Sequence, residues 1–213
     1  MHGLYALRSA LPRRCNREIA MKNINCLLCG VGGQGTVLAS KLLAFAAMQK
    51  GLDVRTSETI GMAQRGGCVV SHVRMGQDIA SPMVPKQSAQ VVIGFEPGEA
   101  VRCLDYLAED GFVITNSKGV MPITANFGGA KYEPGEMIEY LKANVKNLII
   151  VDGDDICKQC GSTKVLNIAL LAAAAKTGRL GITVDELKSA IVMRMPEKFH
   201  AINLKAVEIA ASK

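Results

Sequence analysis

A run of closely spaced glycines, Gly30-Val31-Gly32-Gly33-Gln34-Gly35, constrains the fold of this chain more than any other feature. It lies between an apolar run, 24–29, and a helical pattern, 36–50. The order G-x-G-x-x-G suits a strand–turn–helix unit, because its glycines permit a tight turn, close approach of a ligand and close packing of helix on strand. Backbone N–H groups at the start of the helix would face an anion. We therefore expect a doubly wound sheet to begin here, with a binding crevice where its first strand ends.

Strands and helices alternate along the rest of the chain. The apolar or alternating segments expected to form further strands are 52–56, 68–75, 91–95, 112–115 and 148–151. The segments expected to form further helices are the one opened by Glu96-Pro97, 136–144, 165–175, the one from the capping box 183–186 to a point before Pro196, and the C-terminal segment. This alternation predicts a three-layer α/β/α fold with a mostly parallel, Rossmann-like sheet.

Two of the predicted helices carry long apolar surfaces. The segment 165–175 is apolar on every side except for Asn167, so it must be buried in the domain or against a partner. The last helix is expected to place Phe199, Ile202, Ala206 and Ile209 on one side. That stripe would pack either on the domain or on another chain.

The net charge of +6 over 213 residues is unevenly distributed. Residues 1–20 contribute +3 of it, and no stripe of Lys and Arg interleaved with aromatic residues follows, which argues against nucleic-acid binding. We interpret 1–20 as an extension from an upstream start codon, disordered or artefactual, with a transit peptide as the alternative. The folded domain is then 21–213. No apolar stretch reaches the ~20 residues that span a bilayer, so we expect a cytoplasmic protein without a membrane partner.

Seven cysteines without a secretory signal indicate free thiols in a reducing compartment. Cys26 and Cys29 lie three apart in a predicted strand, so they point to opposite faces and belong to the core. Cys157 and Cys160 lie just ahead of the predicted helix 165–175, where a helix start would lower a thiol pKa. A redox or metal role for this second pair is the alternative to an unreactive one, but no other pair completes a four-ligand site.

The sequence contains no G-x-S-x-G, H-E-x-x-H or P-loop motif, so we assign no catalytic residue and no metal ligand. A loop expected at 57–67 begins close to Glu58, which is near the place where a dinucleotide-binding acid would meet a ribose. Arg65 and the glycines beside it suit a second phosphate or an interface instead. His72, in the strand 68–75, is expected to be structural rather than catalytic.

Four stretches of the chain resemble the gamma-type subunits of 2-oxoacid:ferredoxin oxidoreductases. They read GVGGQGTVLASKLLA, SETIGMAQRGGCVVSHVRMG, SPMVPKQSAQVVIGFEPGEAVR and MPEKFHAINLKAVEIA. The resemblance runs from about Met21 to the C-terminus, and it is strongest to the branch of that family that acts on indolepyruvate. The segment G-M-A-Q-R-G-G in register with the glycine turn is far more specific than either motif alone.

The resemblance implies a domain that works with a larger subunit and is inactive alone. In that family the larger subunit carries thiamine diphosphate and iron–sulfur clusters, decarboxylates an aryl pyruvate, reduces ferredoxin and yields an aryl acetyl-CoA and CO2. The gamma-type domain is associated with coenzyme A and covers the reaction site. The resemblance makes Gly30, Gly32, Gly33, Gln34 and Gly35 candidates for the contact with the nucleotide or the pantetheine phosphate. It makes Met62, Ala63, Gln64, Arg65, Gly66 and Gly67 candidates for a cofactor-binding loop that faces coenzyme A or the large subunit, and Glu58 and His72 follow as further candidates.

Three alternatives remain at this stage. The substrate could be another 2-oxoacid, namely pyruvate, 2-oxoglutarate or a branched-chain acid. The glycine turn and Glu58 would also suit a free-standing NAD-dependent dehydrogenase, although no acid–base pair accompanies them. The chain could finally be an interaction module that binds no small ligand.

Overall fold

The computed structural model describes residues 23–60, 67–120 and 132–212. The predicted extension, 1–20, lies outside the described residues. The strands are β1 (Ile24–Val31), β2 (Asp53–Ile60), β3 (Cys68–Gly76), β4 (Ala89–Gly94), β5 (Leu107–Asn116) and β6 (Asn147–Val151). The helices are α1 (Thr36–Gln49), α2 (Pro97–Arg102), α4 (Pro134–Asn144), α5 (Gly153–Cys160), α6 (Leu166–Lys176), α7 (Val184–Arg194) and α8 (His200–Ser212), with short 3-10 turns at Leu104–Tyr106, Thr163–Val165 and Glu197–Phe199.

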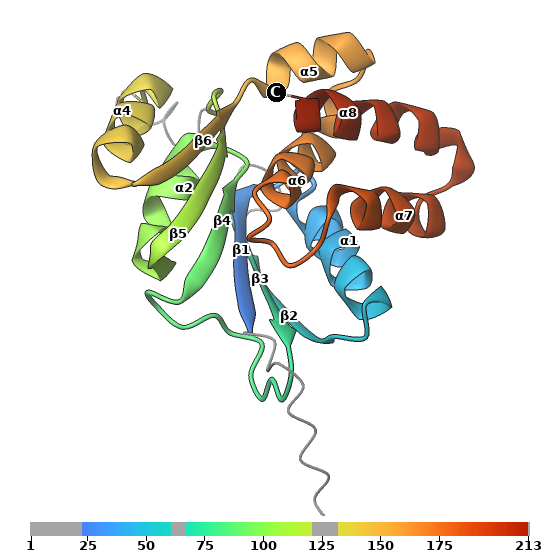
Figure 1. Ribbon diagram of the computed structural model, residues 1–213. Helices are drawn as coiled ribbons and strands as arrows, with labels where there is room; N and C mark the ends of the chain where they lie inside the picture. The colour runs from blue at the N-terminus through green and yellow to red at the C-terminus, as the bar shows by residue number, and fades with distance from the viewer. Residues whose placement is uncertain (1–22, 61–66, 121–131, 213) are drawn as a thin grey trace, which may run out of the picture.

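The strands form one mixed sheet in the order β2-β3-β1-β4-β5-β6 (Figure 1). Neighbours among β1, β4, β5 and β6 are parallel, which confirms the predicted α/β fold for this part of the sheet. Strand β3 is antiparallel to both β1 and β2. The seven residues between β2 and β3 are too few for a parallel crossover, which needs a dozen or more, so this pair forms a hairpin.

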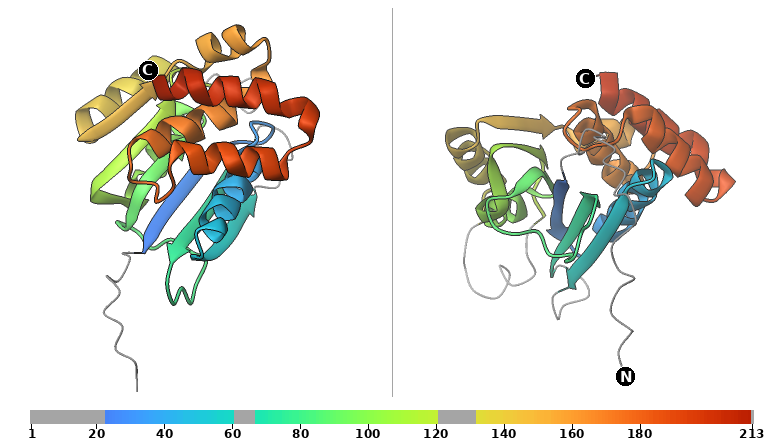
Figure 2. Two further views of the ribbon diagram at one scale, coloured as in Figure 1. Left: turned by 45° about the vertical axis from the view of Figure 1, so that its right-hand side comes forward. Right: turned by 60° about the horizontal axis from the view of Figure 1, so that its bottom comes forward.

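The helices cover both faces of the sheet, as Figure 2 shows in two further views. Helices α2 and α4 lie on one face, and α1 and α6 lie on the other, with α7 packed on α1 and α8 packed on α6. In the described part of the chain, no helix combines the length and the apolar character that crossing a membrane requires.

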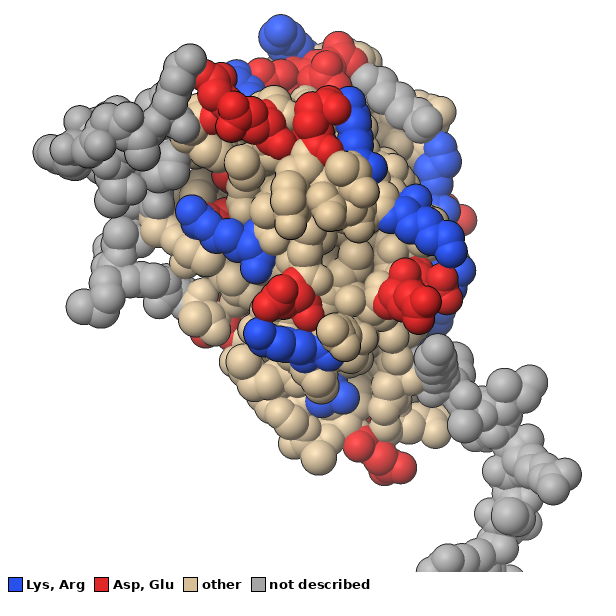
Figure 3. Space-filling model, turned by 90° about the vertical axis from the view of Figure 1, so that its left-hand side faces the viewer, with Lys and Arg blue, Asp and Glu red and all other residues tan. Residues whose placement is uncertain are grey.

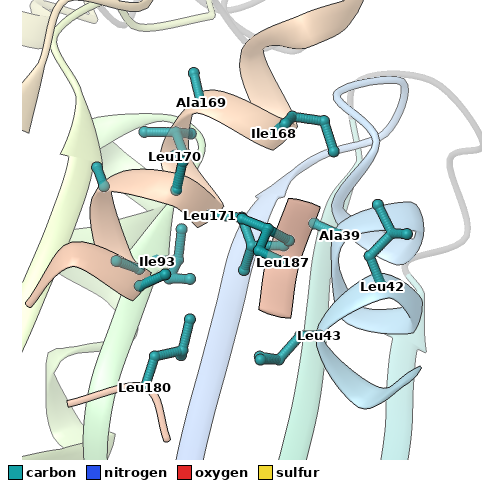
Figure 4. Close-up of a cluster of buried hydrophobic side chains, with 14 of the residues drawn as sticks. Ala39, Leu42, Leu43, Ile93, Ile168, Ala169, Leu170, Leu171, Leu180 and Leu187 are labelled. Carbon is teal, nitrogen blue, oxygen red and sulfur yellow. The ribbon is translucent and has the colours of Figure 1, made fainter. Parts of the chain in front are cut away.

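Helix α6 is the centre of the larger core. Residues 167–175 are all buried, and Leu170 and Leu171 lie among Ile93 of β4 and Leu187 of α7 (Figure 4). The sequence left open whether this apolar helix is buried in the domain or against another chain. The structure buries it in the domain, because α1, α5, α7 and α8 surround it.

Three local predictions need correction. The second strand extends to Ile60 instead of ending at 56, since its polar half pairs with β3. Residues 153–160 form α5, which the sequence reading did not include. In the C-terminal segment Ala206 is buried and Ile202 and Ile209 pack against the core of the domain, whereas Phe199 precedes α8 and is 41% exposed, so it does not belong to the packed stripe. The capping box at Thr183 and Glu186 is confirmed, with both reciprocal bonds present.

Candidate functional site

The glycine turn follows β1 at the edge of the sheet where the parallel strands end. Strand β1 continues through Gly30 to Val31, two residues beyond the predicted end. Gly33 and Gly35 have φ values of 101° and 82°, which side chains other than glycine rarely tolerate. A Cβ on Gly30 would lie 2.8 Å from the Cβ of Phe95, so this glycine permits close packing against the chain that leaves β4.

The side chain of Gln34 closes the turn from inside. Its Oε1 accepts a hydrogen bond from the backbone N–H of Val31 at 2.8 Å. Its Nε2 donates to the carbonyl of Phe95 at 3.1 Å. The amide of Gln34 thus ties the turn to the end of β4, and its role is to hold the turn in shape.

The second motif meets the glycine turn. The N–H of Gly32 donates to the carbonyl of Gly67 at 2.8 Å. The two segments come together because β1 pairs antiparallel with β3 in a register that sets Val31 opposite Cys68, so the next residue after β1 meets the last residue before β3. Met62, Ala63, Gln64, Arg65 and Gly66 lie outside the described residues, and their ligand contacts stay predictions.

A hollow of about 290 Å³ lies at the turn. Its lining comprises Val31, Gly32, Gly33, Gly35, Thr36, Val37 and Val69. Within the described ranges no side chain caps the N-terminus of α1, and its first turn contains no acidic residue. The backbone N–H groups of a first helical turn have no partner within their own helix, so here they are available to an anion.

Thr36, the first residue of α1, adds a polar side chain to this hollow. The residue is 3% exposed, and its Oγ1 has no hydrogen-bond partner among the described residues. A buried hydroxyl without a partner costs about 1–3 kcal/mol. A ligand oxygen at the turn would supply the missing partner.

The glycine turn also lies at the topological switch point of the sheet. Strands β1 and β4 are parallel neighbours, and they continue into α1 on one face and α2 on the other. In open α/β sheets, ligands bind in the crevice outside the ends of two such strands. At this switch point the glycine turn follows β1 and Phe95 follows β4, whereas the hollow itself is lined by the turn, the start of α1 and Val69 of β3.

Glu58 lies inside β2 and not in a loop after it. Its Oε1 accepts a hydrogen bond from the Oγ of Ser40 in α1 at 3.3 Å. Strand β3 separates β2 from β1, which places Glu58 about 10 Å to the side of the glycine turn at the usual strand spacing. The hairpin thus takes this carboxylate away from the position at which it would face a ribose bound at the turn.

Two residues at the crevice were missed by the sequence reading. The side-chain amide of Asn167, in α6, donates to the carbonyl of Gly35 at 3.4 Å. The carboxylate of Glu96 is buried and accepts bonds from the N–H of Gly98 at 2.8 Å and the hydroxyl of Tyr132 at 2.6 Å. Burial and the bond to Glu96 raise the pKa of Tyr132, which keeps this hydroxyl a donor. The sequence did contain a signal for Asn167, because it is the only polar residue in the apolar segment 165–175.

His72 is structural, as expected. Its Nδ1 accepts a hydrogen bond from the N–H of Val84 at 3.2 Å, and its ring packs edge-on against Tyr106 with centroids 5.7 Å apart. The residue is 2% exposed, and burial lowers its pKa from 6.5.

This burial predicts a pH dependence of stability. The unfolded chain takes up a proton at His72 near pH 6.5 that the folded chain resists, so the stabilisation is complete above that pH and is lost as the pH falls below it. We expect the free energy of unfolding to fall by up to about 1.4 kcal/mol more in the wild type than in His72→Gln when the pH drops to about 5.5. Urea titrations at about pH 7.5 and 5.5 measure the difference, and parallel losses in both chains would contradict it.

The cysteine pairs differ from each other. Cys26 and Cys29 are buried on opposite faces of the sheet, in the α6 and α2 cores respectively, as predicted. Cys157 and Cys160 lie in the last turns of α5 and not ahead of a helix start, so the expected lowering of the pKa is wrong for Cys157. Burial instead raises the pKa of Cys157. Among the described residues, no three side chains of the metal-binding types come together in a way that could hold a metal ion.

Several related proteins match most of this chain. An indolepyruvate oxidoreductase subunit IorB of Pyrococcus horikoshii is 34% identical over 191 residues, which are 89% of this chain and 95% of the relative. The corresponding subunit of Archaeoglobus fulgidus is 36% identical over 187 residues, covering 87% and 92%. A common gamma subunit of the pyruvate and ketoisovalerate oxidoreductases of Pyrococcus abyssi is 28% identical over 186 residues, covering 86% and 93%.

Solved structures share the fold. The pyruvate oxidoreductase subunit PORC of Thermotoga maritima superposes with a TM-score of 0.67 at 20% identity, covering 90% of this chain and 96% of that one. A 2-oxoglutarate:ferredoxin oxidoreductase of Magnetococcus marinus, solved with coenzyme A bound, gives a TM-score of 0.64 at 17% identity, covering 89% of this chain and 30% of that one.

The model of one protein family spans nearly the whole folded part of the chain. That family is described as pyruvate ferredoxin/flavodoxin oxidoreductase, and its match covers residues 25–213. The match begins within β1, so the glycine turn, the hairpin and all the helices above fall inside it. The chain therefore belongs to the pyruvate ferredoxin/flavodoxin oxidoreductase family.

Proposed function

We propose that this chain is the small subunit of a cytoplasmic 2-oxoacid:ferredoxin oxidoreductase that converts indolepyruvate, coenzyme A and oxidised ferredoxin to the aryl acetyl-CoA, CO2 and reduced ferredoxin. The relatives that are more than 30% identical are subunits of indolepyruvate oxidoreductases, and this observation carries the substrate. Subunits shared by the pyruvate and ketoisovalerate enzymes are less similar, at 28% identity.

Within this enzyme the chain would bind coenzyme A and cover the reaction site. The hollow at the glycine turn fits a phosphate group of coenzyme A, because it combines free N–H groups of α1 with the unpartnered hydroxyl of Thr36. Bound coenzyme A supplies the thiol that accepts the acyl group. Gly33 and Gly35 would let its phosphate approach the backbone, and Gln34 and Asn167 would hold the turn in the required shape.

A larger subunit would carry the remaining chemistry. Among the described residues, no group of metal-binding side chains comes together. We therefore place thiamine diphosphate and the iron–sulfur clusters on a partner chain, which would also pass electrons to ferredoxin. A NAD-dependent dehydrogenase would need an acidic residue that binds the ribose beside the glycine turn. Glu58 does not suit this role, because β3 separates β2 from β1 and its carboxylate accepts a hydrogen bond from Ser40.

Anaerobic affinity isolation of this chain from its own cells tests the proposal. We expect a stoichiometric larger chain that brings both iron and thiamine diphosphate. The isolated complex should form acyl-CoA from indolepyruvate with a kcat/KM at least about tenfold above that for pyruvate. A chain that comes alone and retains NAD would reject the subunit assignment, whereas a complex that prefers pyruvate would reject only the substrate.

Thr36→Val tests the coenzyme A site directly. The substitution keeps the shape of the side chain and removes a hydroxyl that has no partner among the described residues, so the thermal stability should stay the same or rise. A hydrogen bond to a charged phosphate contributes about 1.5–3 kcal/mol, so the KM for coenzyme A should rise about ten- to a hundredfold.

Ser71→Ala is the matched control for this prediction. Ser71 also has a buried Oγ without a partner among the described residues, but it lies in the middle of β3 and does not line the hollow. We expect its KM for coenzyme A to remain that of the wild type. Equal KM values in Thr36→Val and Ser71→Ala would remove Thr36 from the site.

A further inference from the structure

The two outer strands of the sheet differ in how they protect their free edges. Strand β2, at one edge, contains the charged residues Asp53, Arg55 and Glu58. Strand β6, at the other edge, reads NLIIV and contains no charge and no proline. Within the described residues β6 pairs with β5 alone, so its outer backbone groups are free to pair with another strand. An apolar edge without such protection is a template for pairing with a further chain.

The side chains of β6 extend this apolar edge to both faces of the sheet. Ile150 is 37% exposed, and Leu148 and Ile149 are half-buried. On the α6 face, a groove of about 390 Å³ runs beside β6. Its lining is mostly apolar and includes Phe112, Ile149, Ile150, Val151 and Ile156, with Asp152, Lys176 and Thr177 as its polar members. Figure 3 views the molecule from the side of α4 and β6, where uncharged surface occupies the middle of the face and charged side chains surround it.

The charges at the two ends of β6 specify what can pair with it. Lys146 directly precedes the strand, and Asp152 directly follows it. If two copies of β6 run antiparallel about a two-fold axis through Ile149, Lys146 of each copy lies opposite Asp152 of the other. The same register places the exposed Ile150 opposite Leu148 of the second copy, on the same face of the sheet. Opposite charges and apolar pairs in these positions each stabilise an antiparallel ladder.

We propose that β6 is the interface between two copies of this chain, which pair β6 to β6 and join their sheets into one continuous sheet. The self-complementary order of Lys146, NLIIV and Asp152 carries this inference, because an isologous interface requires one segment to match itself in reverse. The two grooves beside β6 then lie next to each other and close over apolar side chains. The dimer leaves the glycine turn, at the end of β1, open to ligand and partner.

Disulfide crosslinking of the full chain tests whether the two-fold axis of the dimer passes through Ile149. Residues opposite each other in antiparallel strands have Cα atoms about 4.5–5.5 Å apart, within the range that a disulfide spans. Ile149→Cys should therefore give a covalent dimer on mild oxidation, far above the wild-type background from the exposed Cys68. Thr56→Cys, on the exposed part of the β2 edge, is the matched control and should stay at background.

Sedimentation of the full chain tests whether Lys146 and Asp152 stabilise the dimer. Lys146→Asp should raise the dimer dissociation constant at least about tenfold, since it places two carboxylates opposite each other at both ends of the interface. Adding Asp152→Lys should restore most of the affinity. Asp152 also caps α5, by accepting a bond from the N–H of Asp155 at 3.0 Å, so thermal melts must show that the double variant is folded. Ile150→Lys, which changes no cap, should weaken the dimer as strongly as Lys146→Asp.

Three results would overturn the proposal. A wild-type chain that sediments as a monomer at every soluble concentration would exclude the dimer. Equal crosslinking of Ile149→Cys and Thr56→Cys would exclude β6 as its axis. In the complex isolated from cells, crosslinking of Ile149→Cys to a larger chain instead of to itself would assign the edge to that partner. None of these results would affect the proposed role of the glycine turn.

Discussion

Gly35→Ala is expected to raise the KM for coenzyme A at least about tenfold in the assembled enzyme. Gly35 has a φ of 82°, and a Cβ there would lie 2.7 Å from the Nδ2 of Asn167. The added methyl group therefore strains the backbone and pushes away the side chain that binds the carbonyl of Gly35. Both effects move the N–H groups that we assign to the phosphate. Steady-state kinetics with coenzyme A as the varied substrate measure the change.

Gly51→Ala is the control that distinguishes an effect on the coenzyme A site from an effect of backbone strain alone. Gly51 follows α1 with a φ of 77°, and a Cβ there would meet nothing within 4 Å. Both variants should lose about 1–2 kcal/mol of stability, because both place alanine in the left-handed region. Only Gly35→Ala should change the KM for coenzyme A. If Gly51→Ala raised this KM equally, the loss would come from general destabilisation and not from the turn.

Phe95→Ala is expected to destabilise the folded chain by about 3–5 kcal/mol, the usual cost of deleting a buried aromatic side chain. Phe95 is fully buried, and it joins three parts of the fold. Its N–H donates to the carbonyl of Cys29 at 2.7 Å, its carbonyl accepts from Gln34, and its Cβ lies beneath Gly30. For a chain of this size the loss corresponds to a fall in Tm of about 10 °C.

Phe199→Ala removes the same side chain from the surface. Phe199 is 41% exposed and stacks with Lys198, whose Nζ lies 5.1 Å from the ring centroid. Its replacement should cost less than about 1 kcal/mol. Thermal unfolding of both variants measures the contrast. Equal falls in Tm would show that Phe95 does not occupy the packed position described above.

Local sequence patterns predicted most of the secondary structure correctly. The strands at β1, β3, β4, β5 and β6 and the capped helix α7 depend on neighbouring residues, so the periodicity and the capping box sufficed. The prediction failed at 57–60, where pairing with another strand decided the outcome. The residues 57–60 look like a loop because they are polar, yet they form the second half of β2, since β3 satisfies their backbone groups.

The candidate site also contains one part that the sequence predicted and other parts that it did not. The glycine turn was recognisable from its spacing alone, because the positive φ values at Gly33 and Gly35 strongly favour glycine. The parts contributed by Asn167 and Glu96 were not recognisable as a site, because they come from segments far away in the chain. Their meeting depends on strand order, which local patterns do not encode.

The sequence by itself determined the α/β class, the phosphate-sized turn and the family resemblance, because each depends on residue types at fixed short spacings. Only the tertiary structure decided that a hairpin separates Glu58 from the turn, that α6 is buried in the domain, and that Cys157 lies at the end of a helix with a raised pKa. These outcomes depend on which segments pack together. Packing is set by the sum of many long-range contacts, so no single stretch of the sequence specifies it.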